Sequence, residues 1–164
     1  MSAHRQRGFT IIELLVAITI IGILAALTAG IAVYVMDVDH RHLAKSQIET
    51  LTTLIETYKL DQGAYPEQGN GDAGNSTAAL IAALSPTRPD AKIYPIPVRM
   101  FDSYRAGLDE DTIRASAHYL VDPFGRPYHY QYTGAINRNG ETCYDLWSRG
   151  SKDSADPKLW IKNW

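Results

Sequence analysis

The sequence predicts an α+β fold: a long N-terminal helix, with its apolar half in a membrane, and a small antiparallel β-sheet domain packed on the C-terminal half of that helix. Residues 9–36 form an apolar run that contains a single charge. Apolar residues then recur at three- and four-residue steps over residues 37–61, the period of a helix with one buried face. Residues 126–133 alternate tyrosines with polar residues, and residues 142–148 can return as their antiparallel partner.

The apolar run is long enough to cross a membrane. As a helix it would span roughly 42 Å, and about 20 apolar residues suffice to cross a bilayer. Arg5 and Arg7 precede the run, so the N-terminus is expected to stay in the cytoplasm. No later stretch is apolar enough to span, which predicts a single pass with the C-terminal domain outside the cytoplasm. A cleaved secretory signal is disfavoured, because its apolar region has only about 7–15 residues.

Glu13 is the one charged residue in the apolar run. A carboxylate within a membrane-spanning helix costs on the order of 2.5–3.5 kcal/mol. Either the side chain lies close enough to the membrane surface to reach water, or it pairs with a cation that another molecule supplies. The run itself contains no lysine or arginine, so the second alternative predicts an intermolecular ion pair.

One helix is expected from about Thr10 to about Asp61, since no proline interrupts this region and Gly63 is a suitable stop. Residues 62–164 then form the globular domain. Its first part is expected to contain a polar loop, a short helix, a proline-rich extended loop and a second short helix, in that order, at residues 67–76, 77–84, 85–97 and 108–118.

The turn of the predicted hairpin is marked by Asn139 and Gly140.

Cys143 is the only cysteine, so it cannot form an intramolecular disulfide and is expected to be a small core residue. The net charge of -2 gives no field that would attract nucleic acid. The nearest approach to a metal cluster consists of Asp37, Asp39, His40 and His42. These residues do not share one helix face, which favours a solvated surface.

Residues 8–16 resemble the class III signal of type IV pilins and pseudopilins. The matching features are a short basic leader, Gly8 before the cut, Phe9 after it and Glu13 four residues later. The resemblance implies that a prepilin peptidase removes residues 1–8 by cutting between Gly8 and Phe9, and that the new Phe9 amine is methylated. In a helical filament of identical subunits, this cation would lie beside Glu13 of a neighbouring subunit and provide its partner.

Gly22 and Gly30 are candidate assembly residues within the apolar segment, where pilins commonly have a proline. Each glycine weakens the helix by roughly 1 kcal/mol relative to alanine. Two interpretations stay open. The stretch between them loosens when subunits move from the membrane into the filament, or the glycines permit close packing of helices.

Four further segments resemble, in order, the motifs of the major pseudopilins of type II secretion systems: residues 58–66, 122–128, 144–150 and 161–164. Residues 67–120 are a variable middle that matches no motif. The resemblance implies a pilin fold and a structural role as the main subunit of a periplasmic pseudopilus, anchored first in the bacterial inner membrane. The implied partners are other copies of the chain, the prepilin peptidase, the inner-membrane assembly platform and minor pseudopilins.

The resemblance also implies a calcium ion held by the loop before the closing motif. Asp153 and Asp156 are the candidate ligands, because calcium takes six to eight oxygen ligands. Arg149 and Lys152 are poor neighbours for a cation, and residues 159–160 are apolar where the family has acids. The alternative is that the site is lost and that tryptophan packing holds the loop.

Two other functions compete with the pseudopilin. A type IV pilus subunit for adhesion, motility or DNA uptake shares the N-terminal motif, but such pilins usually have a disulfide-closed C-terminal loop, which one cysteine cannot make. A membrane-anchored enzyme would tolerate Glu13→Ala and be active as the isolated domain. No enzyme is predicted, because nothing orients His118 or His129 as a base beside Cys143.

Overall fold

The structure is a computed structural model of the whole chain, and it describes residues 9–69, 73–86, 88, 90–132, 144–151 and 155–164. The chain divides into a unit that ends at Val38 and a unit that begins at Asp39.

Helix α1 (Ile11–Gln62) is continuous over 52 residues, which confirms the predicted long helix. It stops at Gly63, whose φ of 78° lies in the left-handed region that glycine adopts without strain. The Gly63 amide donates to the carbonyl of Lys59 at 2.8 Å, and this bond closes the last turn. The end of the helix is therefore set by one glycine at the position that favours it.

The first unit contains the apolar half of α1. Residues Ile11–Thr28 have a mean hydropathy of 2.6, and none of them is buried within the chain. They form the one helix in the described part of the chain that is long and apolar enough to cross a membrane. The helix is unbroken from Gly22 to Gly30. The predicted loosening concerns a filament, so it stays a prediction.

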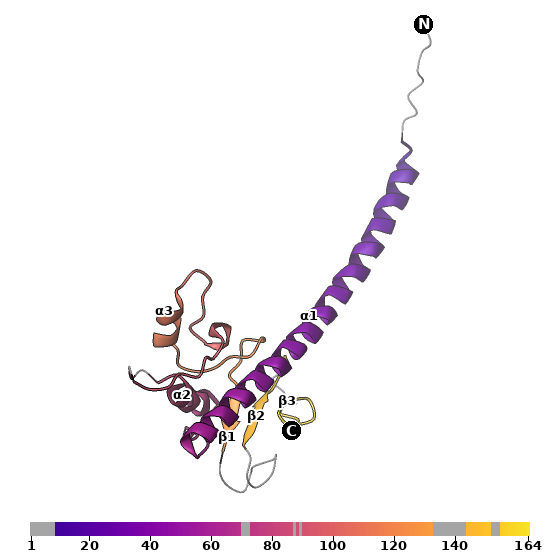
Figure 1. Cartoon of the computed structure of the whole chain (residues 1–164). Coiled ribbons are helices and arrows are strands. Elements are labelled where there is room, and N and C mark those ends of the chain that lie inside the picture. The colour runs from indigo at the N-terminus through magenta and orange to yellow at the C-terminus, as the bar shows by residue number, and fades with distance from the viewer. Residues whose placement is uncertain (1–8, 70–72, 87, 89, 133–143, 152–154) are drawn as a thin grey trace. The chain divides into compact units, whose positions relative to one another are not determined.

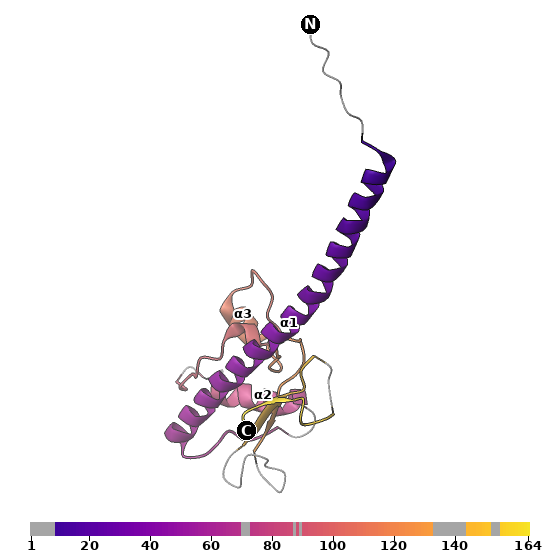
Figure 2. The ribbon, with the colours of Figure 1, turned by 90° about the vertical axis from the view of Figure 1, so that its right-hand side faces the viewer.

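The second unit contains an antiparallel sheet in the order β1-β2-β3, formed by His129–Gln131, Asp145–Ser148 and Ile161–Lys162. Tyr130 lies opposite Leu146, which confirms the predicted pairing of the two segments. Both strands are shorter than predicted, and β3 was not predicted as a strand. The predicted turn at Asn139 and Gly140 and the predicted core residue Cys143 lie outside the described residues. Figures 1 and 2 show the strands beside the C-terminal half of α1.

Aromatic side chains fill the space between the sheet and α1. Tyr128 and Tyr144 are almost completely buried, together with one face of α1: Ala44, Ile48, Leu51 and Ile55. The Tyr128 hydroxyl donates to Gln47 Oε1 at 2.7 Å, and burial raises the pKa of this phenol. The periodic stripe predicted for residues 37–61 is thus the core face of the helix.

The middle segment contains α2 (Ala73–Leu84), the 3-10 helix η1 (Val98–Met100) and α3 (Glu110–Ala115). Helix α2 begins within the predicted polar loop, so the prediction of loop up to residue 76 was wrong. The reason is tertiary: the hydroxyls of Ser76 and Thr77 are buried and accept hydrogen bonds from the amides of Tyr130 and Leu120.

Helix α3 is shorter than the predicted 108–118. Asp109 is its N-cap, and the carboxylate accepts a hydrogen bond from the Thr112 amide at 2.9 Å. Helix α3 contacts η1. At the other end, the hydroxyl of Ser116 turns back to the carbonyl of Thr112 at 2.7 Å, where the helix stops.

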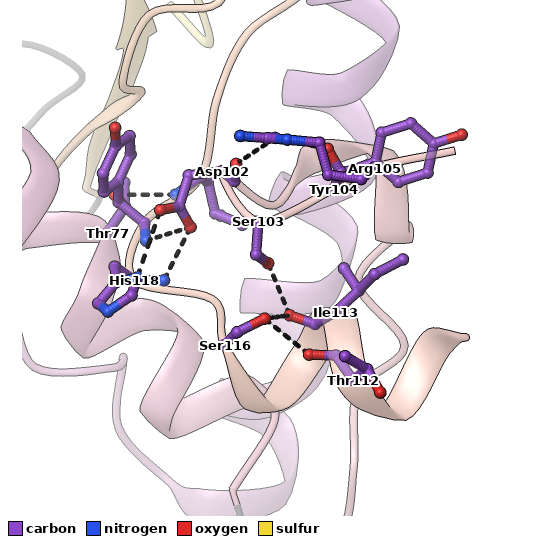
Figure 3. Close-up of polar contacts among 11 residues, drawn as sticks. Thr77, Asp102, Ser103, Tyr104, Arg105, Thr112, Ile113, Ser116 and His118 are labelled. Carbon is purple, nitrogen blue, oxygen red and sulfur yellow. Dashed lines mark hydrogen bonds and ion pairs between the residues drawn. The ribbon is translucent and has the colours of Figure 1, made fainter. Parts of the chain in front are cut away.

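Figure 3 shows the polar contacts that join the segment after η1 to α3 and to the residues that follow α3. The Asp102 carboxylate accepts from the amides of His118 and Tyr119 at 2.8 and 3.2 Å, and it lies 3.5 Å from His118 Nδ1. The neighbouring Ser103 hydroxyl donates to the carbonyl of Ile113 at 2.6 Å. Although a serine, a histidine and an aspartate are close here, the serine is bonded to the backbone and not to the imidazole. This group therefore fixes the loop and does not activate a nucleophile.

We expect Tyr128→Phe to lower the free energy of unfolding by about 1 kcal/mol, because it removes the hydrogen bond to Gln47 while the ring stays in place. Thermal unfolding followed by near-ultraviolet circular dichroism measures this. Tyr58→Phe is the matched control, since the half-buried Tyr58 hydroxyl makes no hydrogen bond in the described part of the chain. Equal melting temperatures for the two variants would contradict the role of the Tyr128 hydroxyl.

Candidate functional site: the N-terminal motif and the C-terminal loop

Glu13 forms a capping box with Thr10 at the start of α1. The amide and the hydroxyl of Thr10 both donate to Glu13 Oε2, at 2.9 and 2.8 Å. In return, the Glu13 amide donates to the Thr10 hydroxyl at 3.3 Å. A threonine followed three residues later by a glutamate is the sequence signature of this arrangement. The two partners predicted for Glu13 were water and a cation from another molecule, and the capping box with Thr10 was not predicted.

The two bonds from Thr10 use the same oxygen of the carboxylate. Within the described residues, Glu13 Oε1 accepts no hydrogen bond, so it can accept one from another molecule. The capping box also fixes the direction of the side chain, because two donors hold Oε2 against the first turn of the helix. At the start of the helix, Oε2 of Glu13 is therefore bonded within the chain, and Oε1 can accept a hydrogen bond from another molecule.

Phe9 lies directly before Thr10 and is 83% exposed. A cut after Gly8 would therefore create an ammonium group one residue away from the Thr10 amide that already faces Glu13. Gly8 and the rest of the predicted leader lie outside the described residues.

Gly22 is a predicted assembly residue in the apolar half of α1. A Cβ added at Gly22 would meet nothing within 4 Å, so that face of the helix is open.

A second site is built by the turn that follows the variable middle. Asp122 is buried, and its Oδ1 accepts from the amides of Phe124 and Arg126 at 2.9 Å each. Its Oδ2 accepts from the hydroxyl of Ser148, which in turn accepts from the Gly150 amide at 3.0 Å. Burial raises the pKa of the Asp122 carboxyl, and the hydrogen bonds from these donors oppose the shift. Two segments that resemble family motifs, 122–128 and 144–150, are joined through this carboxylate.

The closing motif completes the same structure. Asn163 pairs with Leu146 through its backbone amide at 3.1 Å and through its side-chain oxygen at 3.0 Å. The ring of Trp147 stacks between those of His129 and Trp160, at centroid distances of 4.8 and 5.3 Å. The first segment, 58–66, also reaches the sheet, because the ring of Tyr65 packs edge-on against that of Tyr144 at 5.2 Å and the Pro66 carbonyl accepts from the Tyr130 hydroxyl at 2.8 Å. All four segments singled out in the sequence thus meet around the small sheet.

The candidate calcium ligands are only partly described. Asp153 lies outside the described residues, so the predicted pair stays a prediction. Asp156 is exposed, and its Oδ1 accepts from the amide of Lys158 at 3.0 Å. Among the described residues there is no group of three or more histidine, cysteine, aspartate or glutamate side chains that could hold a metal ion. Calcium requires six to eight oxygen ligands, so its binding at this loop stays a prediction.

The N-terminal segment and the fold together define the class of this protein. Residues 3–29 match the model of the prokaryotic N-terminal methylation motif. With the long apolar helix and the small antiparallel sheet, this match defines a subunit of the type IV pilin-like class.

The chain is 31% identical to type II secretion system core protein G of Pseudomonas aeruginosa, over 100% of this chain and 99% of that protein. It is 37% identical to the core protein G of Escherichia coli K12, over 99% and 94% of the two chains, and 32% identical to that of Dickeya chrysanthemi, over 98% and 88%. The chain belongs to the type II secretion system core protein G family, the major pseudopilins. No solved structure matches it significantly.

We expect Thr10→Val to reduce the assembled fraction of the chain about fivefold, since it removes the hydroxyl bonds of the capping box, worth about 1 kcal/mol in net terms. The measurement is the amount of chain in filaments sheared from cells that overproduce it. Thr19→Val is the control, because the Thr19 hydroxyl bonds only to the carbonyl of Leu15 in its own helix. If both variants assemble alike, the capping box does not orient Glu13 for assembly.

Proposed function

We propose that this chain is the main structural subunit of a type II secretion pseudopilus. The observation that carries this proposal is the similarity to core protein G, which extends over the whole chain. The exposed apolar half of α1 supports it, because a helix with no buried residue in its apolar window needs lipid or other helices around it. Growth of such a filament from the inner membrane would push folded proteins towards an outer-membrane channel.

Assembly depends on a charge pair between neighbouring subunits. After cleavage, the methylated amine of Phe9 in one subunit would bind Glu13 of its neighbour. Glu13 Oε1 is the oxygen that accepts this bond, since Oε2 is bonded to Thr10. In an apolar surrounding, loss of one partner of such a pair costs about 3–5 kcal/mol. The pair would therefore fix the register between adjacent helices.

The chain has two successive environments in this proposal. Before assembly it is a single-pass inner-membrane protein with its N-terminus in the cytoplasm and its second unit in the periplasm. The prepilin peptidase, the inner-membrane assembly platform, minor pseudopilins and other copies of the chain are its partners. Gly22 and Gly30 lie in the stretch that adapts to the change from lipid to filament. We assign no catalytic residue.

A type IV pilus subunit is the second candidate. The methylation motif at residues 3–29 favours it equally, because both kinds of filament use this motif. The two candidates differ in what the cell loses without the chain, which allows a direct test.

Purified chain from cells with an active prepilin peptidase is expected to begin with an N-methylated Phe9. Mass spectrometry of the N-terminal peptide measures the loss of residues 1–8 and the added methyl group. Gly8→Arg is expected to leave the leader in place, because the bulky side chain would occupy the cleavage position. An intact Met1 in the wild-type chain would contradict both the cleavage after Gly8 and the assembly role proposed for the Phe9 amine.

Deletion of the gene is expected to leave secreted proteins inside the cells while surface filaments persist. The secreted proteome and the sheared filament fraction measure the two outcomes side by side. Complementation with the wild-type gene, and its failure with Glu13→Ala, links the defect to assembly. Loss of surface filaments with normal secretion would instead establish the type IV pilus candidate.

A further inference from the structure

The loop between β2 and β3, residues 149–160, is held at its first end by a backbone site at Gly150. This glycine is buried and has a φ of 71°. Its amide donates to the Ser148 hydroxyl at 3.0 Å, and its carbonyl accepts from Nη1 of Arg126. Both backbone polar groups of Gly150 are therefore bonded where the chain leaves the sheet.

The second end of the loop is held by another arginine. Nη2 of Arg41, on α1, donates to the carbonyl of Leu159 at 3.4 Å. A Cβ built on Gly150 would lie 3.6 Å from the same nitrogen and 3.9 Å from the Leu159 carbonyl oxygen. The Arg41 guanidinium thus lies where the two ends of the loop approach each other.

A groove beside Arg41 is lined by further basic side chains, so its charge has the same positive sign as the guanidinium. This groove has a volume of about 310 Å³, and its lining consists of Arg41, His42, Lys45, Trp160, Ile161 and Lys162. No carboxylate is among these residues, and a divalent cation here would be repelled by the guanidinium and ammonium groups. A guanidinium group, in contrast, has five N–H donors in a fixed plane and stays charged at any physiological pH.

We propose that the guanidinium groups of Arg41 and Arg126 hold the C-terminal loop in this chain, in place of the calcium ion that the family resemblance implies. A calcium ion fixes such a loop by collecting carbonyl and carboxylate oxygens. Here the carbonyl oxygens at the two ends of the loop, Gly150 and Leu159, accept hydrogen bonds from the two arginines. The two ends of the loop are consequently held without a metal ion, one by Arg41 of α1 and the other by Arg126. This inference goes beyond the proposed function and holds for either kind of filament.

The three tryptophans of the chain report on this loop. Trp160 belongs to the loop, and it stacks on Trp147 of β2, which contacts Trp164 edge-on at 6.1 Å. Undocking of the loop would separate these rings and expose them to water. The intrinsic tryptophan fluorescence of the full chain is therefore a direct measure of docking.

The experiment uses the full chain in detergent micelles, treated with EGTA and then titrated with CaCl₂. We expect the emission maximum and the melting temperature to be the same in both conditions. Arg41→Gln and Arg126→Gln are expected to shift the emission to longer wavelength and to lower the melting temperature by about 4 °C, equally with and without calcium. Lys45→Gln is the matched control, because Lys45 lines the same groove without holding either carbonyl.

Two results would overturn the proposal. One is a saturable rise of the wild-type melting temperature with calcium, together with tryptophan-sensitised terbium luminescence that calcium displaces. The other is wild-type fluorescence and melting in Arg41→Gln. Since Arg126 is close to the buried Asp122, Arg126→Gln could fail to fold. Arg41→Gln keeps a good helix former on the surface of α1, so it tests the proposal by itself.

Discussion

The structure depends on one constraint, the apolar surface of the first half of α1, which the chain does not cover by itself. Its apolar window has no buried residue, so lipid or other helices must surround it. The helix therefore has two parts: the first half needs lipid or other helices around it, and the second half packs against the globular domain. The second half must then supply a core for everything that follows it, and it does so with a single face of small and aliphatic residues.

The side chains that pack on this single face of α1 include many aromatic residues. In the described part of the chain the sheet has three short strands, and large side chains on or beside them cover the helix. Tyrosines from the strands and from the turn before them span the remaining distance, and their hydroxyls reach polar groups on α1 and in the segment that follows it. Apolar contact and hydrogen bonding are thereby combined in the same side chains, so the domain remains specific although its sheet is small.

Sequence patterns predicted the features that depend on local order. The length of α1, its stop at Gly63 and the pairing of β1 with β2 follow from periodicity, glycine and alternation. The Thr10 and Glu13 capping box has an equally local signature and could have been found. The contacts of Arg41 with Leu159 and of Arg126 with Gly150 could not, because they join residues far apart in the chain, and neither carbonyl has a side-chain signature. The early start of α2 has the same cause, since only tertiary contacts bury Ser76 and Thr77.

The place of β3 in the chain has a consequence for biogenesis. This strand pairs with β2, and Asn163 beside it holds the backbone of Leu146, yet these residues are synthesised long after α1. The aromatic layer on α1 is therefore not closed while the ribosome is still making the domain. A chain that cannot complete its tertiary structure early remains extended enough to be threaded across a bilayer. In the topology proposed above, the order of synthesis would thus favour an export-competent domain until translocation is nearly finished.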